Sequence, residues 1–178
     1  AREWSVGPDV ESRTLVRLSE QYAEAASALV SGPQTVIHGE LYPNNVLIRD
    51  ARIYPVDWEW AAVASGEIDL AALTEGRWDA SIVGACVDAY CAARWPDGRD
   101  PAFERRLGAA RAYLHMRSLG GRPGRAGTEA TAWRWSALER VLDEHALATA
   151  GCAGRCRRSS QSGQRRGGHG GHSSSGAC

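Results

Sequence analysis

Lysine is absent from this chain of 178 residues, and all 21 basic side chains are therefore arginines. This absence excludes any catalytic or phosphate-binding role for a lysine amine. Long apolar runs are also absent, so no segment reaches the roughly 18 residues that mark a membrane-spanning helix. Residues 1–13 lack the basic start and apolar core of a secretion signal. We therefore expect a soluble cytoplasmic protein without a membrane partner.

The five cysteines do not form the even set of a disulfide framework. Cys86 and Cys91 lie in an apolar stretch with helical spacing, which favours small core residues. The other three lie in residues 151–178. An odd count without a secretion signal favours a reducing compartment, in agreement with the cytoplasm.

Residues 151–178 contain no Leu, Ile, Val or aromatic side chain. They carry five arginines and no acidic residue, which leaves 16 arginines against 21 acidic residues, a net charge of about −5, in residues 1–150. A segment without apolar side chains cannot bury enough surface to offset the entropy of ordering the chain. The composition predicts one folded domain over residues 1–150 and a disordered Gly/Ser/Arg-rich tail over residues 151–178.

Two other interpretations of the tail are weaker. Cys152, Cys156, His169 and His172 have a spacing similar to that of a zinc finger. The two histidines are one residue closer together than usual, and no apolar residue is present to form a finger core. Arginines among glycines can bind nucleic acid, but the tail has no aromatic side chain to stack on bases. We therefore favour an unstructured extension and expect no nucleic-acid partner.

The folded part has the pattern of a mostly helical domain. One short strand over Thr35–Ile37 precedes a hairpin formed by Val46–Ile48 and Arg52–Val56. Apolar residues recur at helical spacing in five other segments: Val10–Val30, Ile68–Thr74, Asp79–Ala93, Pro101–Leu119 and Thr128–Thr149. One hairpin among about five helices is a helix-dominated α+β arrangement.

Most of the tryptophans fall in or beside these segments. Because indole rings bring a large apolar area, we expect them to be core residues rather than ligand platforms. The six tryptophans to which this expectation applies are Trp58, Trp60, Trp78, Trp95, Trp133 and Trp135.

Polar residues with a particular spacing lie between the predicted strands. Phosphoryl transfer from a nucleotide needs a carboxylate to orient the attacking hydroxyl and hard oxygen ligands to hold Mg²⁺ against the phosphates. Kinase catalytic loops place this carboxylate two residues after a histidine, and a metal-binding asparagine five residues after the carboxylate. His38, Glu40 and Asn45 have this spacing, and Asp57 follows the second hairpin strand, where another metal ligand would stand. Each residue alone could be a turn residue or a strand-end cap, so the ordered set carries the hypothesis.

The segments HGELYPNNVLI, from His38, and PVDWEWAAVASGEIDLAAL, from Pro55, resemble the catalytic core of the aminoglycoside phosphotransferase and choline kinase-like family. Members of this family share the protein-kinase-like fold and phosphorylate small molecules. The resemblance implies the C-terminal lobe of that fold, with the catalytic β-hairpin among the helices. Gly39 stands where protein kinases carry Arg, and this favours the small-molecule branch.

The resemblance also implies a role for each residue of the set. Glu40 is the implied catalytic carboxylate, and His38 braces the catalytic loop. Asn45 and Asp57 are the implied ligands of Mg²⁺ and, through the metal, of the nucleotide phosphates. Asp69 is implied to accept backbone N–H bonds that hold the loop in place, although alone it could be an N-cap of its helix.

Glu40 departs from the family pattern, which has Asp at this position. The extra methylene moves the carboxylate oxygens outward by about 1.5 Å, and positioning dominates this chemistry. The pocket is built around the longer side chain, or the step is slow, or catalysis is lost. We favour a working variant.

A kinase-like enzyme also needs an N-terminal lobe with a glycine-rich loop over the phosphates and a strand Lys. Only 37 residues precede His38, most of them form one predicted helix, and they include no lysine and no initiator Met. We therefore expect the C-terminal lobe alone, weakly active or inactive unless a lobe on a separate chain completes it.

The expected function is ATP- or GTP-dependent transfer of the γ-phosphoryl group to a hydroxyl of a small molecule, with Mg²⁺ as cofactor. The alternative is a catalytically degenerate kinase-like module that binds a ligand or regulates a partner. The departure at Glu40 and the missing lobe favour this alternative, and the retention of Asn45 and Asp57 opposes it. The substrate is not encoded in any motif, although an acidic body would suit a cationic one.

Overall fold

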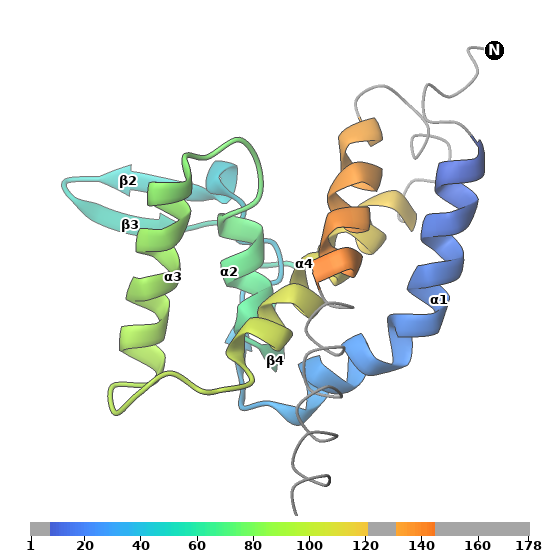
Figure 1. Ribbon diagram of the computed structural model, residues 1–178. Coiled ribbons are helices and arrows are strands. Elements are labelled where there is room, and N and C mark those ends of the chain that lie inside the picture. The colour runs from blue at the N-terminus through green and yellow to red at the C-terminus, as the bar shows by residue number, and fades with distance from the viewer. Residues whose placement is uncertain (1–7, 121–130, 145–178) are drawn as a thin grey trace, which may run out of the picture. The chain divides into compact units, whose positions relative to one another are not determined.

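The computed structural model describes residues 8–120 and 131–144, which form helices and short strands (Figure 1). The helices are α1 (Pro8–Ser31), α2 (Glu67–Leu73), α3 (Ala80–Arg94), α4 (Phe103–Gly120) and a further helix over residues 131–144. The strands are β1 (Gln34–Ile37), β2 (Val46–Arg49), β3 (Arg52–Pro55) and β4 (Ala62–Ser65), and a 3-10 turn, η1 (Pro43–Asn45), precedes β2. The predicted helix-dominated α+β class is confirmed for the described residues.

The predictions for the tail concern residues outside the described ranges. They are the disordered segment 151–178 and the zinc-finger-like set Cys152, Cys156, His169 and His172. Within residues 8–120 and 131–144, no helix is long and apolar enough to cross a membrane.

Two antiparallel sheets of two strands each flank the candidate catalytic segments. One pairs β2 with β3, as the sequence predicts, and the other pairs β1 with β4. In the second sheet Gln34 lies opposite Ser65, and Ile37 lies opposite Ala62. Strand β4 was not predicted because its alanines have low strand propensity, and its structure depends on pairing with a strand far away in the sequence. The prediction of a single hairpin is therefore incomplete.

The β2–β3 hairpin closes with a two-residue turn. Asp50 and Ala51 both adopt positive φ, at 50° and 58°. Two successive positive φ angles define the type I′ turn, whose twist matches that of an antiparallel pair. Asp tolerates this conformation, whereas the Cβ atom of Ala51 makes it unfavourable. The turn therefore stores a small strain that the pairing of the strands offsets.

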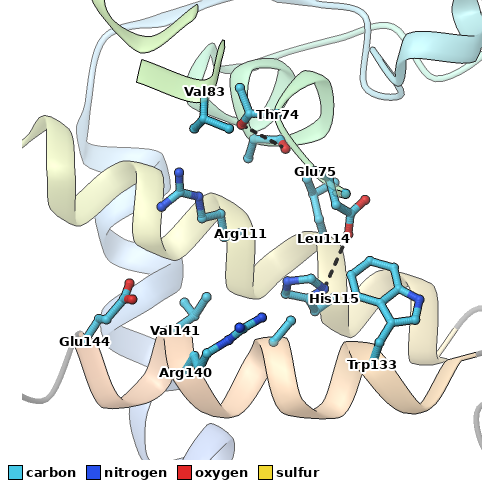
Figure 2. A pocket seen from close by; sticks show the side chains of 13 residues that line it. Thr74, Glu75, Val83, Arg111, Leu114, His115, Trp133, Arg140, Val141 and Glu144 are labelled. Atoms are coloured by element: carbon cyan, nitrogen blue, oxygen red, sulfur yellow. Dashed lines mark hydrogen bonds and ion pairs between the residues drawn. The ribbon is translucent and has the colours of Figure 1, made fainter. Parts of the chain in front are cut away.

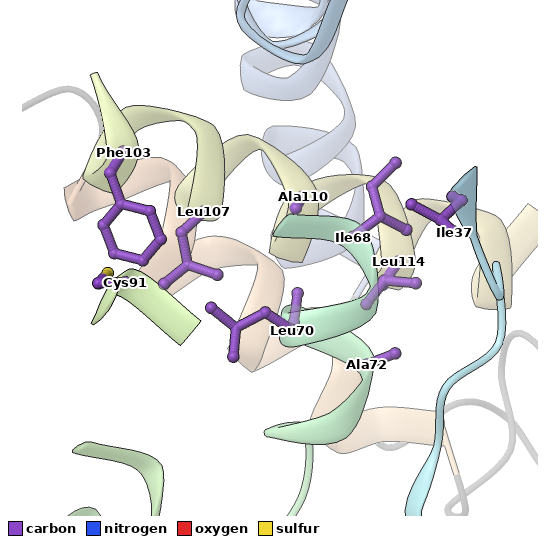
Figure 3. Close-up of a cluster of buried hydrophobic side chains, with 10 residues drawn as sticks. Ile37, Ile68, Leu70, Ala72, Cys91, Phe103, Leu107, Ala110 and Leu114 are labelled. Atoms are coloured by element: carbon purple, nitrogen blue, oxygen red, sulfur yellow. The ribbon is translucent and has the colours of Figure 1, made fainter. Parts of the chain in front are cut away.

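Helix α4 is central to the packing, because it contacts α2 and α1. Its apolar side chains Leu107, Ala110 and Leu114 are at most 2% exposed and face α2 (Figure 3). Phe103, at the start of α4, packs beside Cys91 of α3 in the same cluster. Cys91 is therefore the small core residue that the sequence predicted.

A second cluster lies where α4 meets the helix of residues 131–144. Ala112 and Leu119 of α4 pack against Trp135, Leu138 and other apolar residues of that helix. Because α4 buries residues toward both clusters, it is apolar on more than one face. Both clusters hold α4 in place, and α4 carries several polar groups of the candidate site.

A buried ion pair joins α2 to α4. Arg106 donates from Nε to Glu67 Oε1 at 2.8 Å, and the two side chains are only 4% and 3% exposed. Ser65 Oγ donates to the other oxygen of Glu67 at 2.5 Å. Arg106 Nη2 lies 3.2 Å from Asp100 Oδ2, so the buried cation has two acidic neighbours. Charges this well buried need such partners, and the pair fixes the start of α2 against α4.

The tryptophans correct the sequence prediction. Trp135 is buried at 5% exposure and Trp95 packs against the first core cluster, as expected. The other four are between 43% and 52% exposed, and for them the prediction of core residues is wrong: Trp58, Trp60, Trp78 and Trp133. These indole rings lie at the surface near the candidate site, where several of them stack on arginine or donate a hydrogen bond to a loop carbonyl.

Candidate active site

The second residue of the loop between β1 and β2 is a glycine that no other residue can replace without strain. Gly39 is buried and has φ +82°. A Cβ atom built on it would lie 2.3 Å from the carbonyl oxygen of Trp60. The loop therefore passes close to the segment that leads from β3 to β4. The positive φ of Gly39 and its close approach to the Trp60 carbonyl both require a residue without a Cβ atom. This is a structural reason for glycine at the position where protein kinases carry Arg.

Asp69, in the first turn of α2, binds the start of this loop. Its Oδ2 accepts a hydrogen bond from the backbone N–H of His38 at 2.6 Å, and its Oδ1 accepts one from the N–H of Gly39 at 2.9 Å. One carboxylate thus satisfies two adjacent backbone donors. This geometry is the one that the family resemblance implied for Asp69.

The His38 side chain lies between the loop and the end of β3. It is 2% exposed, its Nε2 lies 2.8 Å from the carbonyl oxygen of Val56, and its Nδ1 accepts the N–H of Glu40 at 3.3 Å. A neutral imidazole with its proton on Nε2 satisfies both contacts. Because both ring nitrogens contact backbone groups, the His38 ring ties the loop to the end of β3.

Asn45 lies at the end of η1 and faces back toward the loop. Its Nδ2 donates to the carbonyl oxygen of Glu40 at 3.0 Å, which fixes the orientation of the amide. Within the described part of the chain, no hydrogen bond involves its Oδ1. The backbone carbonyl of Asn45 accepts the N–H of Val56 at 2.9 Å. The residue before Asp57 is thus bonded to Asn45, and the two predicted metal ligands lie on adjacent chain segments.

Asp57 follows β3 in a strained conformation. It has φ +70° and is exposed. A non-glycine residue at this φ costs about 1 kcal/mol or more and tends to occur at functional sites. Trp58 Nε1 donates to the carbonyl oxygen of Pro55 at 2.8 Å, which closes the turn around Asp57. Among the described residues Asp57 has no ion-pair partner, so its carboxylate is available to a ligand.

The oxygen donors of Asn45 and Asp57 match the preference of Mg²⁺ for hard ligands. Mg²⁺ commonly takes only one or two protein ligands and completes its shell with phosphates and water. No group of three or more His, Cys, Asp or Glu side chains that could hold a metal occurs in residues 8–120 and 131–144. A magnesium nucleotide does not require such a group, so the donor set fits that ligand.

Arg117 is a residue of the site that the sequence analysis missed. It stands in the last turn of α4 and donates from Nη2 to Glu40 Oε1 at 2.6 Å and from Nη1 to the carbonyl oxygen of Gly39 at 2.9 Å. Its guanidinium also lies 4.4 Å from the centre of the Trp60 ring. One oxygen of Glu40 is therefore occupied by Arg117, and the carboxylate is held against α4.

A cavity of about 270 Å³ opens between α4, the helix of residues 131–144 and the loop after α2 (Figure 2). At one end, Arg134 Nη1 donates to Glu75 Oε1 at 2.5 Å, and His115 Nδ1 lies 3.4 Å from the same oxygen. The His115 ring meets Trp133 edge-on, with 5.8 Å between ring centres. The cavity therefore combines a neutralised acid, an imidazole and an indole.

Tyr42 connects this cavity to the catalytic loop. Burial, and then the nearby charge of Glu75, raise the pKa of Tyr42 above its usual value. Arg134, Arg117 and a hydrogen bond with Ser118 act in the opposite direction, so all of these groups lie near the phenol. The cavity is thus adjacent to the loop that carries Glu40.

Comparison with known proteins gives one match. The family model of the phosphotransferase enzyme family matches residues 1–105. No curated protein matches the chain, and no solved structure does so either. The matched range includes the catalytic loop, Asp57 and Asp69, and it ends within α4.

Proposed function

Because the chain belongs to the phosphotransferase enzyme family, we propose that it transfers the γ-phosphoryl group of ATP, or of GTP, to a hydroxyl of a small molecule. The observation that carries this proposal is the set of oxygen donors around one loop. Glu40 Oε1 is held by Arg117, while Asn45 Oδ1 and the Asp57 carboxylate lie on adjacent segments without partners among the described residues. A loop carboxylate beside two oxygen ligands for a metal is the arrangement that phosphoryl transfer from a magnesium nucleotide needs.

Each side chain has a distinct role in this proposal. Glu40 orients the acceptor hydroxyl with its second carboxylate oxygen, Oε2, and accepts the proton as the phosphoryl group is transferred. Asn45 and Asp57 hold Mg²⁺, which when bound neutralises charge on the phosphates. Glu40 is the catalytic residue, because it alone of this set touches the reacting hydroxyl.

Three further residues position the catalytic loop. Asp69 holds the N–H groups of His38 and Gly39, and His38 ties the loop to the strand end before Asp57. Arg117 fixes the rotamer of Glu40 from α4. Preorganisation of this kind matters because displacement of a catalytic group by about 1 Å can reduce the rate by about 100-fold.

The proposal assigns residues 1–150 to the C-terminal lobe of a protein-kinase-like fold, with residues 151–178 as a tail. In the described residues before His38, only α1 and β1 are present, and neither forms a glycine-rich hairpin. We propose that a lobe outside residues 1–178, either upstream in the same polypeptide or on a separate chain, covers the nucleotide, and that residues 1–178 alone turn over slowly or not at all. The free thiols of Cys86 and Cys91 suit the reducing cytoplasm.

The second candidate function is a kinase-like module that binds a magnesium nucleotide without transferring phosphate. The ion pair between Glu40 and Arg117, 2.6 Å long, supports it, because Arg117 occupies one oxygen of the carboxylate that would act on the hydroxyl. Turnover separates the two functions, since both need the metal ligands but only the first needs Glu40 to act on an acceptor.

The first experiment is calorimetric titration of the full chain with Mg·ATP, beside Asp57→Gly and Ala51→Gly. Glycine adopts positive φ freely, so both substitutions relieve backbone strain of similar size. We expect both variants to be as stable as the parent or up to about 1 kcal/mol more stable. Only Asp57→Gly should lose Mg²⁺-dependent binding, and equal binding by both variants would refute the assignment of Asp57.

The second experiment measures ADP release with a panel of hydroxyl acceptors, in the parent and in Glu40→Gln. Phosphoryl transfer that falls by about 100-fold or more in Glu40→Gln, with Mg·ATP affinity unchanged, supports catalysis. Mg·ATP binding without turnover, both for the full chain and after addition of an N-terminal kinase lobe, supports the binding module instead.

A further inference from the structure

The cavity beside the catalytic loop contains more positive charge than its neighbours neutralise. Arg111 of α4, and Arg134 and Arg140 of the helix over residues 131–144, stand in or next to its wall. Arg134 is paired with Glu75 at 2.5 Å. Arg111 and Arg140 have no carboxylate within 4.0 Å in the part of the chain that the structure describes. The wall also contains Glu144, which forms no ion pair within 4.0 Å among the described residues. Three arginines thus stand against two glutamates, and the guanidinium groups of Arg111 and Arg140, from the two facing helices, have no direct ion-pair partner there.

His115 lies close enough to these three arginines for their positive charges to act on its imidazole. It is 6% exposed, and its Nδ1 makes no hydrogen bond within the described residues. Burial, and then the charges of Arg134, Arg140 and Arg111, lower the pKa of His115 to about 4. The imidazole is therefore neutral at physiological pH. Figure 2 shows Arg140 extending along the cavity toward His115, with Trp133 on the other side of the ring.

The position of the cavity along α4 relates it to the catalytic loop. Arg111, Leu114 and His115 line the cavity, and Ser118, one turn further on, bonds to Tyr42 of the loop. Since an α-helix rises about 1.5 Å per residue, the cavity begins within about 5–10 Å of the loop. A small molecule can span this distance between an anchoring group and a reacting hydroxyl.

We propose that this cavity binds an acidic acceptor, a small molecule with a carboxylate or phosphate group held by Arg111 and Arg140. Guanidinium groups match the planar geometry of carboxylates and the oxygens of phosphate. Arg111 is half-buried and Arg140 is exposed, so the ligand would lie at the mouth of the cavity. The half-exposed indole of Trp133 supplies an apolar wall for the rest of the ligand. The direction of the acceptor hydroxyl toward Glu40 rests on the proposed function, but the anion site itself does not.

This inference replaces the expectation of a cationic substrate, which came from the net charge of residues 1–150. The acidic residues that give that net charge are spread over the domain, whereas the cavity wall has two unpaired arginines. Of the two acidic residues in the wall, Glu75 is neutralised by Arg134. The exposed Glu144 is outnumbered by Arg111 and Arg140. The local field at a site decides which ligand binds, and here it favours an anion.

The test is titration of the full chain with four probes by calorimetry: inorganic phosphate, glycerate, glycerol and choline. Arg111→Gln and Arg140→Gln remove one guanidinium each and keep a shorter, neutral polar side chain. Arg52→Gln, at the exposed tip of the β2–β3 hairpin, is the matched control. Thermal unfolding of each variant verifies that it is folded.

We expect saturable binding of phosphate or glycerate but not of glycerol or choline. Arg111→Gln and Arg140→Gln should each weaken that binding by at least about tenfold, because each removes a charge-assisted hydrogen bond. Arg52→Gln should leave it unchanged. The proposal is overturned if neither anion binds, if glycerol binds as well as glycerate, or if both cavity variants bind the anion as the parent does.

Competition with Mg·ATP shows whether the cavity binds the phosphate of an acceptor or that of the nucleotide. Measurement of phosphoryl transfer distinguishes failure of this inference from failure of the proposed function. If Mg·ATP displaces the anion and itself loses affinity in Arg111→Gln, the cavity is a nucleotide-phosphate site and the acceptor assignment is wrong. Anion binding that depends on both arginines, without phosphoryl transfer even after addition of an N-terminal kinase lobe, leaves the anion site standing and contradicts the proposed function. If phosphoryl transfer occurs and the KM for the acceptor is the same in the parent, Arg111→Gln and Arg140→Gln, only the assignment of an acidic acceptor is contradicted.

Discussion

At the scale of single residues, the structure gives a physical reason for the glutamate at position 40. Its longer side chain reaches Arg117 on α4, at 2.6 Å, while its backbone stays tied to His38 and Asn45. An aspartate at the same backbone position would have to extend about 1.5 Å further to make this contact. Glu40 and Arg117 therefore act as a matched pair.

Arg117→Met tests this pairing. It removes both hydrogen bonds to the loop, which are charge-assisted but partly open to solvent, because the Arg117 and Glu40 side chains are 22% and 28% exposed. We expect the free energy of unfolding to fall by about 1–3 kcal/mol, and amide exchange of residues 39–41 to accelerate. Where phosphoryl transfer is measurable, it should slow by about tenfold or more. Denaturant titration and hydrogen exchange provide the measurements.

The control for Arg117→Met is Arg105→Met. Arg105 pairs with Glu24 at 3.6 Å, and both side chains are more than 40% exposed. An exposed ion pair of this kind contributes at most about 1 kcal/mol. Loop exchange should match the parent in this variant. Accelerated exchange in both variants, or in neither, would contradict the specific role of Arg117.

At the scale of elements, the loop between β1 and β2 depends on the absence of a side chain at Gly39. Gly39→Ala forces a Cβ atom to within 2.3 Å of the Trp60 carbonyl oxygen, at φ +82°. We expect the free energy of unfolding to fall by at least about 2 kcal/mol, from backbone strain and overlap together. Urea denaturation followed by tryptophan fluorescence provides the measurement.

Gly108→Ala is the matched control for Gly39→Ala. Gly108 lies within α4, and a Cβ atom there has no heavy atom within 4 Å. Alanine in a helix interior is favoured over glycine by about 0.8–1 kcal/mol, so this variant should be more stable than the parent. If the two variants change the free energy of unfolding in the same direction, the positive φ of Gly39 and its overlap with the Trp60 carbonyl do not constrain the loop.

Elements that local patterns define were predicted well, and those that distant contacts define were not. The β-branched residues of β2 and β3 flank a short polar turn, and α1 has apolar residues at helical spacing, so both could be found in the sequence. Strand β4 is alanine-rich and exists because β1 pairs with it. Likewise the spacing of His38, Glu40 and Asn45 identified the loop, whereas Arg117 lies 77 residues after Glu40 and has no local signal.

At the scale of the whole molecule, His115 couples folding to pH. Its pKa is lowered to about 4 in the folded chain, by burial and by three arginines, from 6.5 in the unfolded chain. Between these values the unfolded chain takes up a proton that the folded chain does not, so stability falls as the pH decreases from about 6.5 to about 4. We expect this residue alone to remove about 2 kcal/mol between pH 7 and pH 5.

Denaturant titrations at pH 7 and pH 5, in the parent and in His115→Gln, isolate this contribution. Glutamine does not titrate, so the loss of stability between the two pH values should be smaller in the variant by about the same 2 kcal/mol. The same loss in both proteins would show that His115 is not the group responsible.

The buried pair of Arg106 and Glu67 connects several elements at once, because Asp100, Ser65 and Trp95 also contact it. Arg106→Met leaves the charge of Glu67 buried without its partner, and we expect a loss of about 3–5 kcal/mol in the free energy of unfolding. Arg99→Met, which removes exposed ion pairs to Asp88 and Glu104, should cost less than about 1 kcal/mol.

The double variant Glu67→Gln/Arg106→Met distinguishes loss of attraction from burial of an unpaired charge. The amide keeps an acceptor for Ser65 Oγ and carries no charge, so the double variant should be more stable than Arg106→Met alone by about 1 kcal/mol or more. A double variant that is less stable than the single one would mean that the Glu67 carboxylate stabilises the fold even without Arg106, through the hydrogen bond from Ser65 Oγ. In that case burial of an unpaired charge would not explain the cost of Arg106→Met, and the junction of α2 and α4, with the Asp69 carboxylate under the catalytic loop, would depend on the direct contacts of Arg106 with Glu67 and Asp100.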